Sequence, residues 1–196
     1  KTDYDKYVGF IKKRKFEQFA FKPTHKVSSL KANVFSKPIK SSKIKMKLSF
    51  TSLLQVKSSN KEFFNFDNYW IQKSDVVPIK YKEKIFKRIK IFRNVKYKWG
   101  GKTFDGIDCS GLLQLFYKFN NLYCPRDTGP QFRYFKKFKS VKKDAIIFWK
   151  GHVAICLSKK TLIHAYGPRK KVIIMDFKKT VNLIKNTAKL DVIGIK

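Results

Sequence analysis

The sequence predicts an α+β domain preceded by a small all-β barrel, within a chain of 196 residues. Three observations support this prediction. Residues 26–77 consist of short segments that alternate apolar and polar residues, which is typical of strands. Residues 85–92 carry apolar residues at the spacing of an amphipathic helix. Residues 145–176 are again rich in β-forming residues, and helices followed by antiparallel strands define the α+β class.

The predicted barrel covers residues 24–78. Its strand-like segments are VSSLKANVF, KMKLSF, SLLQVKS, FFNFDNYWIQ and DVVPI, and the stretches SKPIKSSK and SSNKE have the composition of turns. Strands that follow one another closely, with no helical period, indicate a small barrel. The arrangement resembles a bacterial Src-homology-3-like domain, in which Trp70 takes the place of a late-strand aromatic residue. The opening segment DKYVGFI resembles the last strand of a second such domain. Residues 1–20 are therefore predicted to be the end of a truncated barrel, joined to the next one by the link KPTHKV.

The α+β part is predicted to span residues 79–196. An amphipathic helix is expected in YKEKIFKRIKIFRNV, where Ile85, Ile89 and Phe92 share one face. A second helix is expected from Cys109, after the glycine-rich stretch WGGKTFDGIDCSG, and residues 120–140 are predicted to be a loop. Strands are predicted for AIIFW, HVAICLS, TLIHAY and VIIMDF, a helix for TVNLIKNTAKL and a last strand for DVIGIK.

The chain carries 46 lysine and arginine residues against 13 aspartate and glutamate residues, which gives a net charge of +33. Such an excess suggests a polyanionic partner. The lysines, however, recur along almost the whole chain, without a basic tail, a zinc-finger spacing, a ribonucleoprotein motif or a heptad zipper. We therefore expect a lysine-rich surface and no specific nucleic-acid partner. The alternative is a weak, salt-dependent contact with an anionic polymer or a membrane surface.

The three cysteines cannot all pair internally, and none belongs to a CxxC motif or to a four-ligand set with zinc-like spacing. We expect no disulfide scaffold, no metal and no cofactor. The sequence holds no apolar window long enough for a transmembrane helix, and no signal-peptide pattern opens it, which favours a cytoplasmic location. Because the chain starts at Lys1 rather than Met, a periplasmic or cell-envelope location is the alternative if a signal precedes it.

The motif DCSGLLQ places a cysteine at the start of the second predicted helix. Asp108 can cap that helix, Gly111 allows close packing, and Cys109 lies in the first turn, where backbone N–H groups and the helix dipole favour an anion. A thiol so placed beside an imidazole can have its pKa lowered to roughly 3.5–7.5 and act as a nucleophile. The alternative is a cysteine that is merely buried, which is how we interpret Cys124 and Cys156.

Two histidines are predicted to lie close together. His152 opens HVAICLS, His164 lies in TLIHAY, and the intervening SKK predicts a hairpin turn. Antiparallel strands joined there bring the two side chains together across the ladder. This pairing suits a base that accepts the thiol proton, His152, and a residue that fixes the tautomer of that base, His164.

In these residues and the motifs around them, the sequence resembles the NlpC/p60 family of cysteine peptidases. The runs YKWGGKTFDGIDCSGLLQ, CPRDTGPQ, DAIIFWKGHVAI and LIHAY occur in the order of that family. The resemblance implies a papain-like catalytic domain, in which helices pack on an antiparallel sheet. It also implies that Cys109 is the nucleophile, His152 the base and His164 the residue that orients the base.

Further site residues and a substrate follow from the same resemblance. It implies that Tyr97 helps the Cys109 N–H to form an oxyanion hole, and that Asp108 and Ser110 bind the terminal amine of the substrate. The order of domains is similar to that of the dipeptidyl-peptidase branch, which cuts the γ-D-glutamyl–diamino acid bond of muropeptides. We therefore expect hydrolysis of peptidoglycan-derived peptides. The alternatives are an amidase or acyltransferase of the same fold, and a non-catalytic module that binds the cell wall or another polyanion.

Overall fold

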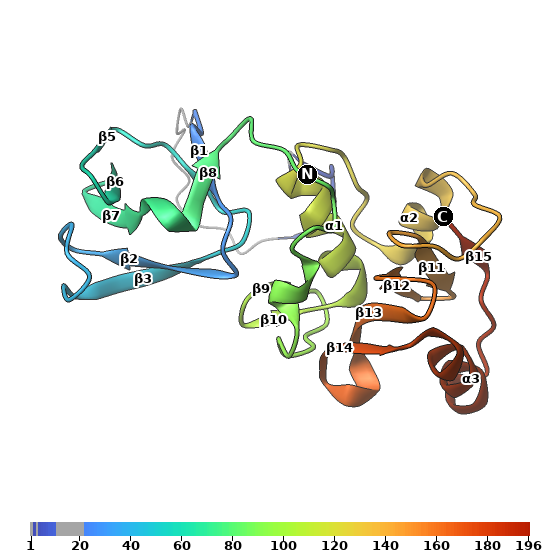
Figure 1. Cartoon of the computed structure of the whole chain (residues 1–196). Coiled ribbons are helices and arrows are strands. Elements are labelled where there is room, and N and C mark those ends of the chain that lie inside the picture. The colour runs from blue at the N-terminus through green and yellow to red at the C-terminus, as the bar shows by residue number, and fades with distance from the viewer. Residues whose placement is uncertain (1, 3, 11–21) are drawn as a thin grey trace. The chain divides into compact units, whose positions relative to one another are not determined.

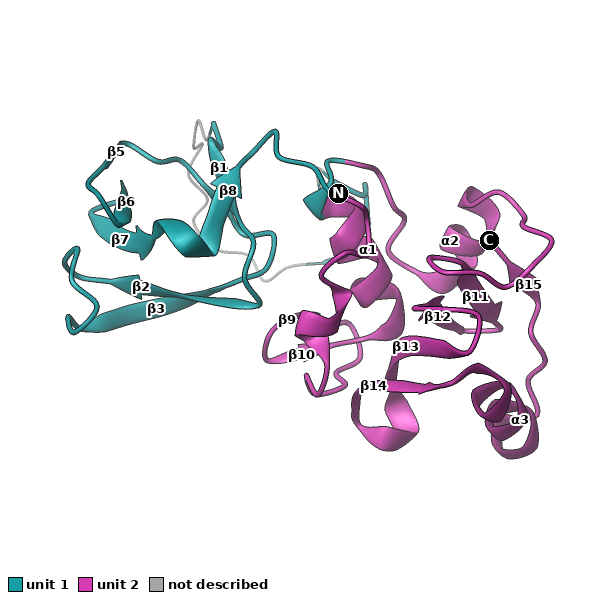
Figure 2. Ribbon diagram, viewed as in Figure 1, with its two compact units in different colours: residues 1–83, 119–121 teal, residues 84–118, 122–196 magenta. Residues whose placement is uncertain are grey.

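A computed structural model describes residues 2, 4–10 and 22–196, and the chain divides into two compact units (Figures 1 and 2). Unit 1 comprises residues 1–83 and 119–121, and unit 2 comprises residues 84–118 and 122–196. The division falls a few residues after the one predicted from the sequence. Among the described residues, no helix is both long enough and apolar enough to span a membrane.

Unit 1 consists of short strands in two antiparallel sheets. Its elements are β1 (His25–Val27), β2 (Lys31–Phe35), β3 (Ile44–Ser49), β4 (Leu53–Leu54), β5 (Ser58–Ser59), β6 (Phe63–Phe66), β7 (Tyr69–Gln72), the 3-10 helix η1 (Lys73–Asp75) and β8 (Val76–Pro78). The strand orders are β4-β1-β8 and β3-β2-β7-β6-β5. Val27, Val34, Leu54 and Ile71 are buried together in its core. The β-rich first part is therefore confirmed, whereas its Src-homology-3-like character stays a prediction.

Several boundaries in unit 1 differ from the prediction. The segment FFNFDNYWIQ is a hairpin rather than one strand, because Asp67 and Asn68 adopt φ values of 41° and 63° and form a two-residue turn between β6 and β7. The predicted link KPTHKV contains strand β1. The predicted strand at residues 5–11 is absent over residues 5–10, while residue 11 lies outside the described residues.

Unit 2 combines helices with one five-stranded sheet. Its elements are η2 (Ile89–Phe92), β9 (Lys102–Thr103), β10 (Gly106–Ile107), α1 (Cys109–Phe119), α2 (Thr128–Tyr134), β11 (Ile146–Trp149), β12 (His152–Cys156), β13 (Thr161–Tyr166), η3 (Gly167–Arg169), β14 (Lys171–Asp176), α3 (Phe177–Ala188) and β15 (Gly194–Ile195). The sheet has the order β14-β13-β12-β11-β15, and all its pairs are antiparallel. This arrangement confirms the mixed helix-and-sheet fold.

The side chains of β12 and β13 alternate between the two faces of that sheet. Ala154 of β12 and Leu162 of β13 are buried in one cluster with Ile184 of α3, so even-numbered residues of these strands lie on the face that α3 covers. His152 and His164 share this parity. The fold therefore places both imidazoles on the α3 face of the sheet.

Two secondary-structure predictions in unit 2 are wrong, one of a helix and one of a loop. The amphipathic helix expected around Ile85–Phe92 is limited to the single 3-10 turn η2, because lysines and arginines recur at helical spacing there without acidic partners after Glu83. The predicted loop at residues 120–140 contains α2, which Gly129 and Pro130 concealed in the sequence.

Candidate active site

Cys109 is the first residue of α1, and its neighbours build the start of that helix. Asp108 Oδ1 accepts a hydrogen bond of 2.7 Å from the Gly111 N–H, so Asp108 caps α1 as predicted. A Cβ atom on Gly111 would lie 2.7 Å from the carbonyl oxygen of Gly101, so only glycine allows the preceding loop to approach this closely. Cys109 is thereby fixed in the first turn, with 6% of its surface exposed.

The two imidazoles come from neighbouring strands. β12 and β13 are paired at Ile155–Ile163, and both histidines lie beyond this pair on the same side. His152 Nε2 lies 2.9 Å from His164 Nδ1. The predicted proximity of the two side chains is confirmed.

His164 is fully buried and held by two neighbours that sequence analysis did not find. The ring of Tyr166 stacks on its imidazole with centroids 4.7 Å apart and an interplanar angle of 11°. Met175 Sδ lies 3.4 Å from His164 Nε2. A thioether can only accept a hydrogen bond, so we assign the proton of neutral His164 to Nε2. His164 Nδ1 then accepts from His152 Nε2–H, which leaves His152 Nδ1 unprotonated and able to act as a base.

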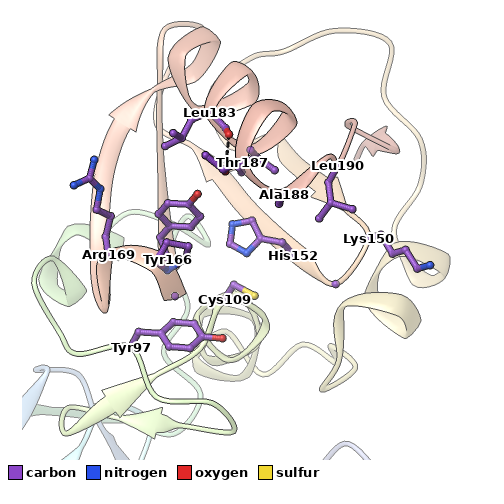
Figure 3. A pocket seen from close by; sticks show the side chains of 14 residues that line it. Tyr97, Cys109, Lys150, His152, Tyr166, Arg169, Leu183, Thr187, Ala188 and Leu190 are labelled. Atoms are coloured by element: carbon purple, nitrogen blue, oxygen red, sulfur yellow. Dashed lines mark hydrogen bonds between the residues drawn. The ribbon is translucent and has the colours of Figure 1, made fainter.

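Cys109, His152 and Tyr97 line one cavity of about 520 Å³ within unit 2 (Figure 3). In Figure 3 the imidazole of His152 lies over the side chain of Cys109, between this residue and α3. Tyr97 packs against Gly167 of η3, with ring carbons 3.6 Å from the position of a Cβ atom there. The arrangement brings a thiol, a base and a phenol to one cavity.

The remaining walls of the cavity come from η3, from α3 and from the turn before β12. Leu183 and Leu190 form part of an apolar wall, and Thr187 contributes a hydroxyl. Of the described residues that line the cavity, the charged ones are Lys150 and Arg169, and both are positive. This surrounding favours an anionic occupant over a cationic one.

Burial governs the ionisation of the site. It raises the pKa of the Cys109 thiol to about 11, and the backbone N–H groups of Val153 and Ser110 offset it only in part. Burial also lowers the pKa of His152, and it lowers that of His164 together with repulsion from His152. The predicted lowering of the thiol pKa is therefore wrong for the resting site. The sequence shows the helix start and the imidazole, but it does not show the loss of hydration around the sulfur.

Tyr97 keeps its proton for a similar reason. Burial first, and then the nearby Cys109 and Asp108, raise the pKa of its phenol above the usual value. Its backbone N–H donates to the Lys170 carbonyl at 2.8 Å, which ties this residue to the end of η3. Tyr97 therefore presents a neutral hydroxyl group that can donate a hydrogen bond.

Asp108 and Ser110 lie in a buried polar network built around Arg126. Arg126 donates from Nη2 to Asp108 Oδ2 at 2.6 Å and from Nη1 to Asp108 Oδ1 at 3.0 Å, and Nη1 also reaches Ser110 Oγ at 2.8 Å. The Gly100 N–H donates to Asp108 Oδ2 at 2.8 Å. Burial alone would lower the pKa of Arg126, but the hydrogen bonds and charge of Asp108 outweigh it and raise that pKa.

This network changes the context of two predicted site residues. Asp108 and Ser110 are not among the residues that line the cavity, and both oxygens of Asp108 already accept hydrogen bonds. Their predicted contact with a substrate amine stays a prediction. Arg126 lies in the motif CPRDTGPQ, which the sequence singled out. Its pairing with Asp108 depends on the folded loop and could not be predicted from the motif.

A second buried side chain, Gln131 of α2, joins the segments of this network. Its Nε2 donates to the Ser110 carbonyl at 3.0 Å and to the Pro125 carbonyl at 2.9 Å. The helix that the sequence concealed therefore braces the start of α1, which carries the nucleophile.

Residues 94–187 match the model of the NlpC/P60 family, a segment that contains every predicted site residue. The chain is 26% identical over 198 residues to the γ-D-glutamyl-L-lysine dipeptidyl-peptidase of Bacillus subtilis (strain 168), covering 89% of this chain and 65% of that protein. It is 30% identical over 129 residues to the protein of the same name from Bacillus cereus, covering 57% and 39% respectively.

Solved structures support the fold. The crystal structure of an NlpC/P60 family protein from Bacillus cereus superposes with a TM-score of 0.75 at 23% identity, covering 89% of this chain and 62% of that chain. The chain thus spans less than two thirds of the length of these relatives.

Proposed function

We propose that this chain is a cysteine peptidase that hydrolyses peptidoglycan-derived peptides at the bond between γ-D-glutamate and a diamino acid. The observation that carries the proposal is a thiol at a helix start, Cys109, which shares a cavity with His152 while His164 holds that imidazole in place. The similarity to γ-D-glutamyl-L-lysine dipeptidyl-peptidases supports the choice of bond.

In the proposed reaction, His152 Nδ1 accepts the thiol proton while Cys109 Sγ attacks the glutamyl carbonyl carbon. Burial favours the neutral thiol and the neutral imidazole at rest. When the proton moves, the attraction between the buried thiolate and imidazolium offsets the cost of forming these two charges. The C–N bond then breaks, His152 returns the proton to the leaving amine, and a thioester remains. Water that gives a proton to His152 hydrolyses the thioester and restores the thiol.

Two hydrogen-bond donors are proposed to stabilise the oxyanion. They are the Cys109 backbone N–H and the neutral hydroxyl of Tyr97, which lines the same cavity. The positive Lys150 and Arg169 suit a peptide in which a γ-linked glutamate keeps its α-carboxylate free. The same proposal includes a cytoplasmic location and a Src-homology-3-like unit 1, both drawn from the sequence pattern.

The test compares Cys109→Ala with Cys124→Ala, which removes a buried thiol outside the cavity. Each protein is incubated with L-Ala-γ-D-Glu-L-Lys and with L-Ala-γ-D-Glu-meso-diaminopimelate, and the release of L-Ala-D-Glu is followed by mass spectrometry. We expect cleavage by the wild type and by Cys124→Ala, and none by Cys109→Ala. Cleavage by Cys109→Ala at the wild-type rate would overturn the assignment of the nucleophile. Release of a different fragment from intact sacculi would favour an amidase.

A further inference from the structure

Unit 1 carries a hairpin that exposes both basic and apolar side chains. We call residues 36–47, the loop between β2 and β3 together with most of β3, the basic hairpin (Figure 1). The stretch from Lys31 to Phe50 contains six lysines and no acidic residue. The hairpin lysines are all exposed, namely Lys37, Lys40, Lys43, Lys45 and Lys47.

Large apolar side chains are exposed among these lysines. Ile39 at the tip of the loop is 54% exposed, and Ile44 and Met46 on β3 are 44% and 40% exposed. Met46 pairs with Val34 of β2, which is fully buried, whereas Met46 is partly exposed. The apolar side of β3 therefore extends beyond the part that the core of unit 1 covers. Alternation puts Lys47 on the opposite side of the strand from Met46, while a register shift next to Met46 pairs Ile44 with Phe35 and leaves Lys45 between the two pairs.

The loop that presents Ile39 is held by its own hydrogen bonds. The Ser36 N–H donates to the Lys43 carbonyl at 3.0 Å and the Ser42 N–H to the Ile39 carbonyl at 3.0 Å. Ser42 Oγ donates to the Lys37 carbonyl at 3.0 Å. A surface that is already ordered does not lose this conformational freedom when it binds.

β3 is the edge strand of its sheet and pairs only with β2 among the described strands. Pairing with the same strand of a second copy would bring lysines against lysines, which is unfavourable. A soluble polyanion would neutralise the lysines but would leave Ile39, Ile44 and Met46 in water. An interface that is both anionic and apolar satisfies both sets of side chains.

We propose that the basic hairpin docks this protein on anionic lipid bilayers. Ile39, Ile44 and Met46 enter the boundary between headgroups and acyl chains, and the surrounding lysines contact lipid phosphates. Long lysine side chains can do so while their aliphatic carbons lie along the apolar region. This docking is independent of the peptidase activity proposed for unit 2.

The test is sedimentation with vesicles of phosphatidylcholine alone and of phosphatidylcholine mixed with phosphatidylglycerol, at low and high salt. We expect binding to the anionic vesicles that weakens as salt rises. Lys43→Gln/Lys45→Gln should weaken binding about 25-fold, since each lysine near an anionic surface contributes about 5-fold. Its matched control is Lys159→Gln/Lys160→Gln, which removes the same charge from an exposed turn in unit 2 and should lose much less.

Ile39→Ser tests the apolar part of the contact. We expect it to weaken binding by about 10-fold at either salt concentration, since part of one isoleucine leaves the bilayer. Ile193→Ser is its control, because Ile193 is 49% exposed in unit 2. Thermal unfolding of each variant verifies that it is folded.

Two results would overturn the proposal. If the control pair of lysine changes weakens binding as much as the hairpin pair, the contact reports net charge rather than this hairpin. If Ile39→Ser binds anionic vesicles as well as the wild type and a DNA duplex of similar charge density competes fully, the hairpin binds polyanions and not bilayers.

Discussion

Replacing Arg126 with methionine tests how much the buried network contributes to the site. The change removes the guanidinium but keeps a side chain of comparable length, so Asp108 loses its ion pair at 2.6 Å in a place where both side chains are less than 10% exposed. Removing one partner of a buried pair typically costs about 3–5 kcal/mol, because the other charge stays desolvated. Asp108 keeps the N–H groups of Gly100 and Gly111, which places the expected loss near 3 kcal/mol.

The matched control is Lys185→Met. Lys185 pairs with Asp191 at 3.0 Å, but the two side chains are 61% and 73% exposed, so we expect a loss below about 1 kcal/mol. Thermal unfolding followed by circular dichroism separates the two cases, since 3 kcal/mol corresponds to roughly 6–12 °C in a chain of this size. Arg126→Lys retains the charge without the bidentate geometry and should fall between the two. Equal melting temperatures for Arg126→Met and Lys185→Met would refute the reasoning.

Three further predictions concern the histidine pair and the start of α1. Met175→Leu removes the acceptor for His164 Nε2–H, and we expect peptidase kcat to fall about 3- to 10-fold with KM unchanged. Met175→Gln restores an acceptor and should recover part of the lost kcat in the same steady-state assay. Burial lowers the pKa values of His152 and His164, so the unfolded chain takes up protons first as the pH falls below their ordinary value of 6.5. The free energy of unfolding should therefore be highest above pH 6.5 and should fall below that pH by about 1.4 kcal/mol per pH unit for each histidine. Denaturant titrations of His164→Asn should show a free energy of unfolding that depends less steeply on pH. Gly111→Ala should lower the melting temperature and the activity together, because its Cβ would collide with the Gly101 carbonyl; an alanine variant as stable and active as the wild type would contradict the close approach.

The sequence was most informative at residue types that have few structural or chemical roles in proteins. A cysteine behind a capping aspartate and two histidines separated by one turn sufficed to predict that Cys109 begins a helix and that His152 and His164 meet. The strands of the unit 2 sheet were also predictable, since apolar segments with clear turn residues between them leave little choice of element.

The sequence was least informative where tertiary structure decides. Met175 touches His164 from strand β14, and nothing in its local sequence distinguishes it from an ordinary core methionine. Helix α2 is held by the contacts of Gln131 rather than by helix propensity, which Gly129 and Pro130 oppose. The ionisation of Cys109 depends on how much water reaches the sulfur, and this is a property of the assembled cavity.

The three cysteines, none of which forms a disulfide bond, can be used to follow the opening motions of this protein. Cys124 and Cys156 are fully buried and Cys109 is nearly so, while burial raises the pKa values of Cys109 and Cys156 to about 11. A thiol reagent can therefore modify Cys124 and Cys156 only during fluctuations that expose their sulfur atoms, whereas Cys109 already lines the cavity. Modification of Cys109 alone would report access to the cavity, whereas modification of Cys156 would require the sheet to separate from α3. The order in which the three sites are labelled thus measures which part of unit 2 opens first.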